Sequence, residues 1–155
     1  MVNAYGVLKF IHVLSVILWV GGVAGLSVVT FQIAREPNRE ALSLLVRHAT
    51  SFGQKVVGPA SGLVLLTGIA MVVTGHLRFG TFWVMWGIGG IAAHFLMGAI
   101  VIRKRTMEVG RLASGQQSGD DAALISAARR LAQMQLLYII LLASVVAMMV
   151  LKPTL

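Results

Sequence analysis

The stretch from Lys9 to Arg35, KFIHVLSVILWVGGVAGLSVVTFQIAR, has no charged residue between its two ends. It is longer than the roughly 20 apolar residues that an α-helix needs to cross about 30 Å of hydrocarbon. Three more gaps without Asp, Glu, Lys or Arg follow, between Lys55 and Arg78, between Arg78 and Arg103, and between Arg130 and Lys152. The sequence therefore predicts an all-α integral membrane protein, folded as a four-transmembrane-helix bundle.

The overall composition supports the same class. The chain has 155 residues, of which 57% are hydrophobic and 12% charged, and its mean hydropathy is +0.87. Soluble globular proteins are less apolar and more charged than this. The absence of cysteine from the sequence excludes disulfides, thiolate metal sites, iron–sulfur clusters and thiol catalysis. We expect a single transmembrane domain over residues 1–155.

The boundaries of the predicted elements follow from the charges and the helix breakers. We expect helices over about 4–34, 56–76, 82–102 and 120–151, with cytoplasmic loops over about 35–55 and 103–119. Residues 41–57, ALSLLVRHATSFGQKVV, are amphipathic, and they read either as an extension of the second helix or as an interfacial segment. Pro59 predicts a kink in the second helix.

The basic residues predict the orientation in the membrane. Ten of the 13 Lys and Arg residues follow the first and third spans, and Lys9, Arg78 and Lys152 remain on the other side. Because cytoplasmic segments carry the excess of Lys and Arg, both termini should face outward, into the periplasm of a bacterium whose inner membrane holds the chain. The net charge of +8 then reflects topology and attraction to anionic lipid. It does not indicate nucleic-acid binding, because the cations are divided between two segments without interleaved aromatic residues.

Two histidines lie inside predicted spans, where an unsatisfied polar group costs several kcal/mol. His12 shares one face of the first helix with Ser15, Trp19 and Gly22, at spacings of 3, 4 and 3. His94 shares a face of the third helix with Gly87, Gly90 and Gly98. Glycine stripes most often serve helix packing, but they also let a flat ligand approach the backbone. Ionisable residues inside spans favour a functional reading for His12 and His94 over one of packing alone.

The remaining side chains limit the chemistry that these histidines can support. All five acidic residues, Glu36, Glu40, Glu108, Asp120 and Asp121, lie in the predicted cytoplasmic segments. A paired-carboxylate site inside the membrane is therefore excluded. Neutral imidazole in a glycine-lined groove suits haem iron as an axial ligand, and imidazole with methionine thioether suits copper.

The pattern IHVLSVILWVGG, a histidine followed seven residues later by Trp-x-Gly-Gly, resembles the first-helix signature shared by two groups of membrane proteins. These are the CopD copper-resistance family and the HemJ-type protoporphyrinogen oxidases. LLTG in the second helix, a histidine late in the third, a basic cluster after it and the terminal VLKPTL also have counterparts there. Size and helix number resemble the HemJ-type branch, or its uncharacterised small relatives, more than the longer CopD proteins.

The resemblance implies that His12 is a haem b ligand and that the protein acts in electron transfer or porphyrin redox chemistry, with a quinone or a porphyrin as partner. The second axial ligand is then His94, favoured by burial, or His76, favoured by depth. We expect Trp19, Gly22 and Gly90 to lie beside the cofactor. The HemJ-type pattern has a lysine near the start of the third helix, where this chain has Phe82 or Trp83, so oxidoreductase activity does not follow from the resemblance.

Two further functions remain open from the sequence. In a CopD-like copper-handling protein, His12, His94 and Met97 would bind the metal ion. In a non-catalytic accessory subunit, the glycine stripes would pack against a partner within a larger membrane complex or against a second copy of the chain.

Overall fold

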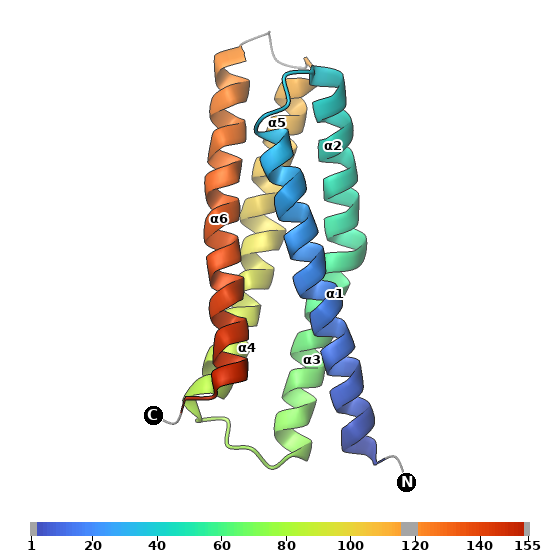
Figure 1. Ribbon diagram of the computed structural model, residues 1–155, viewed down its shortest axis with the longest axis vertical. Coiled ribbons are helices and arrows are strands. Elements are labelled where there is room, and N and C mark those ends of the chain that lie inside the picture. Colours follow the sequence, from blue (N-terminus) through green and yellow to red (C-terminus); the bar gives the residue numbers. More distant parts are fainter. Residues whose placement is uncertain (1–2, 116–120, 154–155) are drawn as a thin grey trace.

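The computed structural model describes residues 3–115 and 121–153 and is a bundle of long helices. Four helical units are long and apolar enough to cross a membrane: Ala4–Ile33, Arg39–Thr74, Phe82–Ala113 and Asp121–Leu151. The described residues contain no strand. Both ends of the chain lie at the same end of the bundle (Figure 1), which we call the terminal end. The prediction of an all-α four-span membrane bundle is confirmed.

The first two spans are joined by a short turn. Helix α1 (Ala4–Ile33) begins after Asn3, whose side chain accepts a hydrogen bond from the backbone N–H of Gly6. The second span consists of α2 (Arg39–Phe52), the π-helical segment η1 (Gly53–Val57) and α3 (Gly58–Thr74). It begins at Arg39, where we expected a loop as far as residue 55. Of the two interpretations of residues 41–57, the structure has the helical extension.

The third span also extends beyond its predicted end. It consists of α4 (Phe82–Leu96), the π-helical segment η2 (Met97–Ile102) and α5 (Arg103–Ala113), where we expected a loop from residue 103. Residues 116–120, including the expected first residue of the fourth helix, lie outside the described residues. Helix α6 (Asp121–Leu151) then returns to the terminal end.

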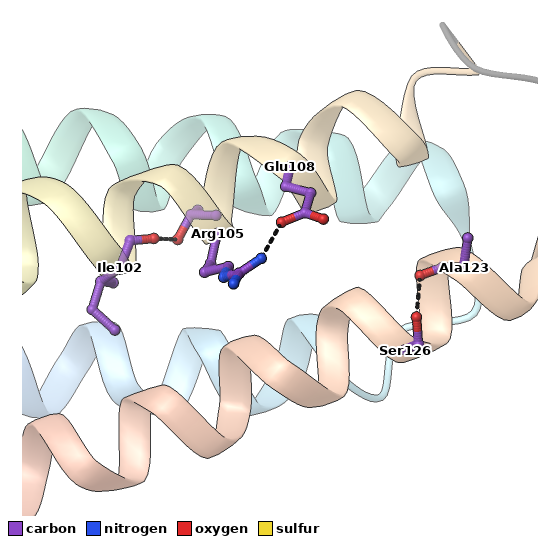
Figure 2. A network of polar contacts seen from close by, with 6 residues as sticks. Ile102, Arg105, Glu108, Ala123 and Ser126 are labelled. Carbon is purple, nitrogen blue, oxygen red and sulfur yellow. Dashed lines mark hydrogen bonds and ion pairs between the residues drawn. The ribbon is translucent and has the colours of Figure 1, made fainter.

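The two segments expected as loops are helical because they share a hydrophobic core of their own. Its buried side chains come from α1, α2, α5 and α6: Ile33, Leu42, Val46, Val109, Ala113, Ala127 and Leu131. Arg39 adds an ion pair with Asp121 and a hydrogen bond to the carbonyl of Leu112. Figure 2 shows the Arg105–Glu108 ion pair of α5 in this region. We call this half of the molecule, opposite the termini, the basic end.

Small residues determine how the spans pack. Helix α1 packs against α3, α3 against α4, α4 against α6, and α6 against α1. A side-chain Cβ at Gly90 of α4 would lie 2.5 Å from Val145 Cγ2 of α6, and one at Gly87 would overlap Met149. A Cβ at Gly22 of α1 would lie 2.8 Å from Val57 Cγ2. These glycines allow close approach of neighbouring helices.

The π-helical segment in the second span precedes Pro59, the residue at which we predicted a kink. Proline has no backbone N–H, so it cannot continue the regular hydrogen-bond series. The N–H of Gly58 bonds to the carbonyl of Gly53 instead, five residues back. The helix passes the proline through this wider turn without ending.

Candidate functional site

A cavity of about 350 Å³ lies between α1, α3, α4 and α6 at the terminal end of the bundle. Its walls are mostly aliphatic, with side chains such as Val16, Val64, Ile91 and Val145. His12 lines this terminal cavity, and its side chain is partly exposed. A mostly apolar pocket with a few polar groups is the usual form of a small-molecule or cofactor site.

The hydrogen bonds around His12 determine which of its ring nitrogens carries the proton. His12 Nδ1 lies 2.8 Å from Thr67 Oγ1, and the Thr67 hydroxyl donates at 2.6 Å to the carbonyl of Leu63. Because Thr67 has a single hydroxyl proton, its oxygen can only accept from the imidazole. Nδ1 therefore carries the hydrogen, and Nε2 keeps the lone pair that a metal ion requires. Metal-binding histidines are commonly oriented by a hydrogen bond from the second ring nitrogen.

The neighbour of Thr67 provides the space for the imidazole. His12 Cε1 lies 3.4 Å from the position that a Cβ would take at Gly68. That distance is the short limit of an ordinary van der Waals contact, so a Cβ at this position would touch the ring. Thr67 and Gly68 are the last two residues of LLTG, one of the motifs that carry the resemblance described above.

Two lysines also line the terminal cavity. Lys9 and Lys152 are both exposed at the terminal end, and Lys152 Nζ lies 5.3 Å from the ring centre of Trp83, over its face. The cavity thus has an imidazole and aliphatic walls within it and cationic groups at the outer surface. Such a site suits a ligand with an apolar body and anionic substituents.

His94 occupies a different and fully enclosed place. Its ring is 0% exposed, stacks on Tyr138 with ring centres 3.6 Å apart, and meets Trp19 edge-on with centres 4.9 Å apart. Within the described part of the chain, neither nitrogen of His94 has a hydrogen-bond partner, and the same holds for Trp19 Nε1. A buried polar group left unpaired costs about 1–3 kcal/mol.

The structure does not bring all the predicted site residues together in one site. His12 and Trp19 line the terminal cavity, whereas His94 and His76 do not. Trp19, which contacts His94, lies seven residues after His12, or about 10.5 Å along the helix at 1.5 Å per residue. His76 is exposed in the turn after α3, with a left-handed φ of 51°. Gly22 and Gly90 contact side chains of neighbouring helices.

Sequence reasoning did not find Thr67, Lys9 and Lys152 as site residues. Thr67 is 55 residues from His12 along the chain. Threonines in membrane spans commonly bond to a carbonyl of their own helix, so a threonine alone does not indicate a site. The two lysines served only to define topology. The LLTG motif could have identified Thr67 from the sequence. Its threonine can accept a hydrogen bond from a histidine on a neighbouring helix, and its glycine leaves space for the imidazole.

The fold and the site together define a class, a four-span integral membrane bundle with a histidine in an apolar cavity between its helices. The chain belongs to the DUF2269 family, described as a predicted integral membrane protein, whose family model matches residues 6–153. No curated protein and no solved structure matches the chain.

Proposed function

We propose that this protein binds haem b in the terminal cavity, with Nε2 of His12 as an axial ligand. The observation that carries the proposal is the arrangement around His12, in which Thr67 takes the Nδ1 hydrogen and leaves Nε2 free to bind a metal ion. In this proposal the chain is a bacterial inner-membrane protein with both termini outward. It acts in electron transfer or porphyrin redox chemistry, for which a bound haem supplies one-electron transfer.

The chemistry of the cavity fits such a group. Aliphatic walls suit the faces of a macrocycle, and the two lysines suit its carboxylate substituents. The volume of about 350 Å³ is near the lower end for small-molecule sites, so haem requires a wider cavity. Met149 is the wall that can move most easily, because its unbranched side chain is flexible and enters the space left by Gly87.

The second axial ligand must come from another segment of the chain that faces His12. His94 and His76 are the candidates from the sequence, but neither lines the cavity that contains His12. Met149 does line it, and a thioether paired with an imidazole is an established set of haem ligands. We therefore propose Met149 as the second ligand in place of His94 and His76.

Copper is the second candidate, and one observation favours it. Met71 and Met149 line the terminal cavity together with His12, and thioether with imidazole is a suitable ligand set for copper. Within residues 3–115 and 121–153, no three His, Cys, Asp or Glu side chains gather. A copper site would therefore depend on these thioethers. An accessory subunit or a homo-oligomer remains the alternative if neither cofactor binds.

Titration of purified, cofactor-free protein with hemin tests the proposal. The full-length chain in detergent should bind one equivalent, with a shifted Soret band. His12→Ala should lose at least about 100-fold in affinity. The matched control is His48→Ala, because His48 is exposed on α2, away from the cavity. Undiminished binding by His12→Ala would overturn the assignment, and stoichiometric binding of Cu(I) without hemin binding would favour copper.

The same titration assigns the second ligand. Met149→Leu should convert a low-spin spectrum to a high-spin one, whereas His94→Ala and His76→Ala should leave it unchanged. The opposite result for His94 would support the pairing predicted from the sequence.

A further inference from the structure

A second cavity of about 350 Å³ lies in the half of the bundle that includes the basic end. We propose that it binds the head group of a lipid-soluble quinone, with the hydroxyl of Tyr138 as hydrogen-bond donor to a quinone carbonyl. The inference goes beyond the proposed haem site, because it concerns different residues and does not require His12.

Tyr138 is the residue that would contact the head group. Its side chain is 7% exposed and lines the second cavity. The hydroxyl lies 2.5 Å from the position of a Cβ at Gly98, which lines the same cavity. Among the residues that the structure describes, no hydrogen-bond partner accepts from this hydroxyl. A donor that opens onto a cavity in an apolar bundle favours a ligand that brings an acceptor.

Three other buried polar side chains that line the cavity already use a donor. The hydroxyls of Ser61 and Thr106 donate to backbone carbonyls of their own helices. Gln135, 1% exposed, donates through Nε2 to Ser27 at 2.8 Å. The hydroxyls of Tyr138 and Thr30, both in buried residues that line the cavity, are the donors for which the described residues provide no acceptor. The ligand group opposite Tyr138 should therefore be an acceptor.

The cavity faces the lipid between the second and third spans. Among its lining residues, Gln54, Pro59, Phe95 and Ala99 are exposed at the surface of the bundle. Both π-helical segments, η1 and η2, contribute to its wall, and π-helical turns are frequent at functional sites. A molecule dissolved in the bilayer can enter here without crossing a polar surface.

Depth favours a quinone over a fatty-acid anion. Arg103 lies at the edge of the cavity. The Tyr138 hydroxyl lies beside Gly98, which is five residues from Arg103, or about 7.5 Å along the helix. A carboxylate bound to Arg103 would place its acyl tail beside Tyr138 and leave the hydroxyl unpaired. A phospholipid phosphate at Arg103 would place an ester carbonyl near that depth, and the Arg103→Gln variant below distinguishes this case. A charged group placed deeper would be costly in hydrocarbon, but a neutral carbonyl is not.

The two cavities are connected by a series of three rings in contact, Trp19 edge-on to His94 and His94 stacked on Tyr138. Tyr138 lines the second cavity, Trp19 lines the terminal cavity, and His94 lies between them in contact with both. A quinone bound at Tyr138 would thus be next to a ring system that reaches the terminal cavity.

Photolabelling tests the inference. The full-length chain in phosphatidylcholine nanodiscs is irradiated with an azido derivative of ubiquinone-2, and labelled peptides are identified by mass spectrometry. We expect saturable labelling of peptides that line the second cavity, abolished by excess unlabelled ubiquinone-2. Tyr138→Phe keeps the ring stack and removes the hydroxyl, and should require about tenfold more probe for half-maximal labelling. Gly98→Ala, which displaces that hydroxyl, should have a similar effect.

Controls separate this inference from the haem proposal and from misfolding. Tyr5→Phe makes the same change at the terminal cavity and should label like the unmodified chain, as should the haem-site variant His12→Ala. Circular dichroism and gel filtration verify that each variant is folded. Labelling that does not saturate, or that is unchanged in Tyr138→Phe, would overturn the proposal. Displacement of the probe by oleate with loss of labelling in Arg103→Gln, but not in Tyr138→Phe, would identify an anionic lipid site instead and would also overturn it.

Discussion

Thr67 is the residue that gives His12 a defined orientation. Its hydroxyl proton is used by the carbonyl of Leu63, so its oxygen is available only as an acceptor for Nδ1–H. We predict that Thr67→Val, which keeps the shape of the side chain, lowers hemin affinity about 10–100-fold without abolishing binding, since partners of metal ligands contribute on this scale. Hemin titration of the purified variant measures the change.

The control is Thr74→Val on the same helix. Thr74 also bonds to its own backbone, at the carbonyl of Ala70, but it is exposed and does not line the terminal cavity. Its substitution should leave hemin affinity unchanged. Equal losses in the two variants would indicate a general effect on α3 and contradict the role assigned to Thr67.

Individual residues show how far the sequence predicts the site. His12 was identifiable because an imidazole within a span requires an explanation. Thr67 and the two lysines were not, because their roles depend on which helices become neighbours. The sequence also placed Gly22 and Gly90 beside the cofactor, whereas in the structure these positions contact Val57 and Val145. A glycine stripe indicates close approach but not what approaches.

At the scale of the helices, the glycines of α4 differ in whether a side chain of a neighbouring helix lies against them. A methyl group at Gly90 would meet Val145, whereas nothing lies within 4 Å of a Cβ at the exposed Gly89. We predict that Gly90→Ala destabilises the bundle by about 1–3 kcal/mol, as overpacking does. Gly89→Ala should cause no loss. Unfolding of each variant by denaturing detergent, followed by circular dichroism, tests the pair, and equal stability would contradict close packing of α4 on α6.

Charge predicts where a span leaves the hydrocarbon but not where its helix ends. Lys55 and Arg103 marked the expected limits of the second and third helices, yet α2 and α5 extend the two spans by further turns. The amphipathic spacing of Leu42 and Val46 left two interpretations of the second span open, a helical extension or an interfacial segment, and the sequence predicted a loop where α5 lies. The partners that stabilise the helical extension, Val109 and Leu131, could be recognised only from the packed structure.

At the scale of the whole molecule, the basic residues and the termini lie at opposite ends of the bundle. Both ends of the chain are at the terminal end (Figure 1), and 10 of the 13 Lys and Arg residues belong to the segments of the other half. We predict that both termini face outward. A reporter active only in the periplasm, fused to the carboxyl end, should work, and one active only in the cytoplasm should be silent. The reverse would place the terminal cavity on the cytoplasmic side.

The central claim is that the bundle carries haem b, and the absorption spectrum of the protein as isolated tests it most directly. Full-length protein should be purified in detergent from haem-replete cells, and its haem and copper contents measured per chain. The account predicts a Soret band, b-type bands on reduction and about one haem per chain, all absent from His12→Ala prepared in parallel. A colourless, folded protein would contradict the account, and near-stoichiometric copper in that sample would establish the alternative.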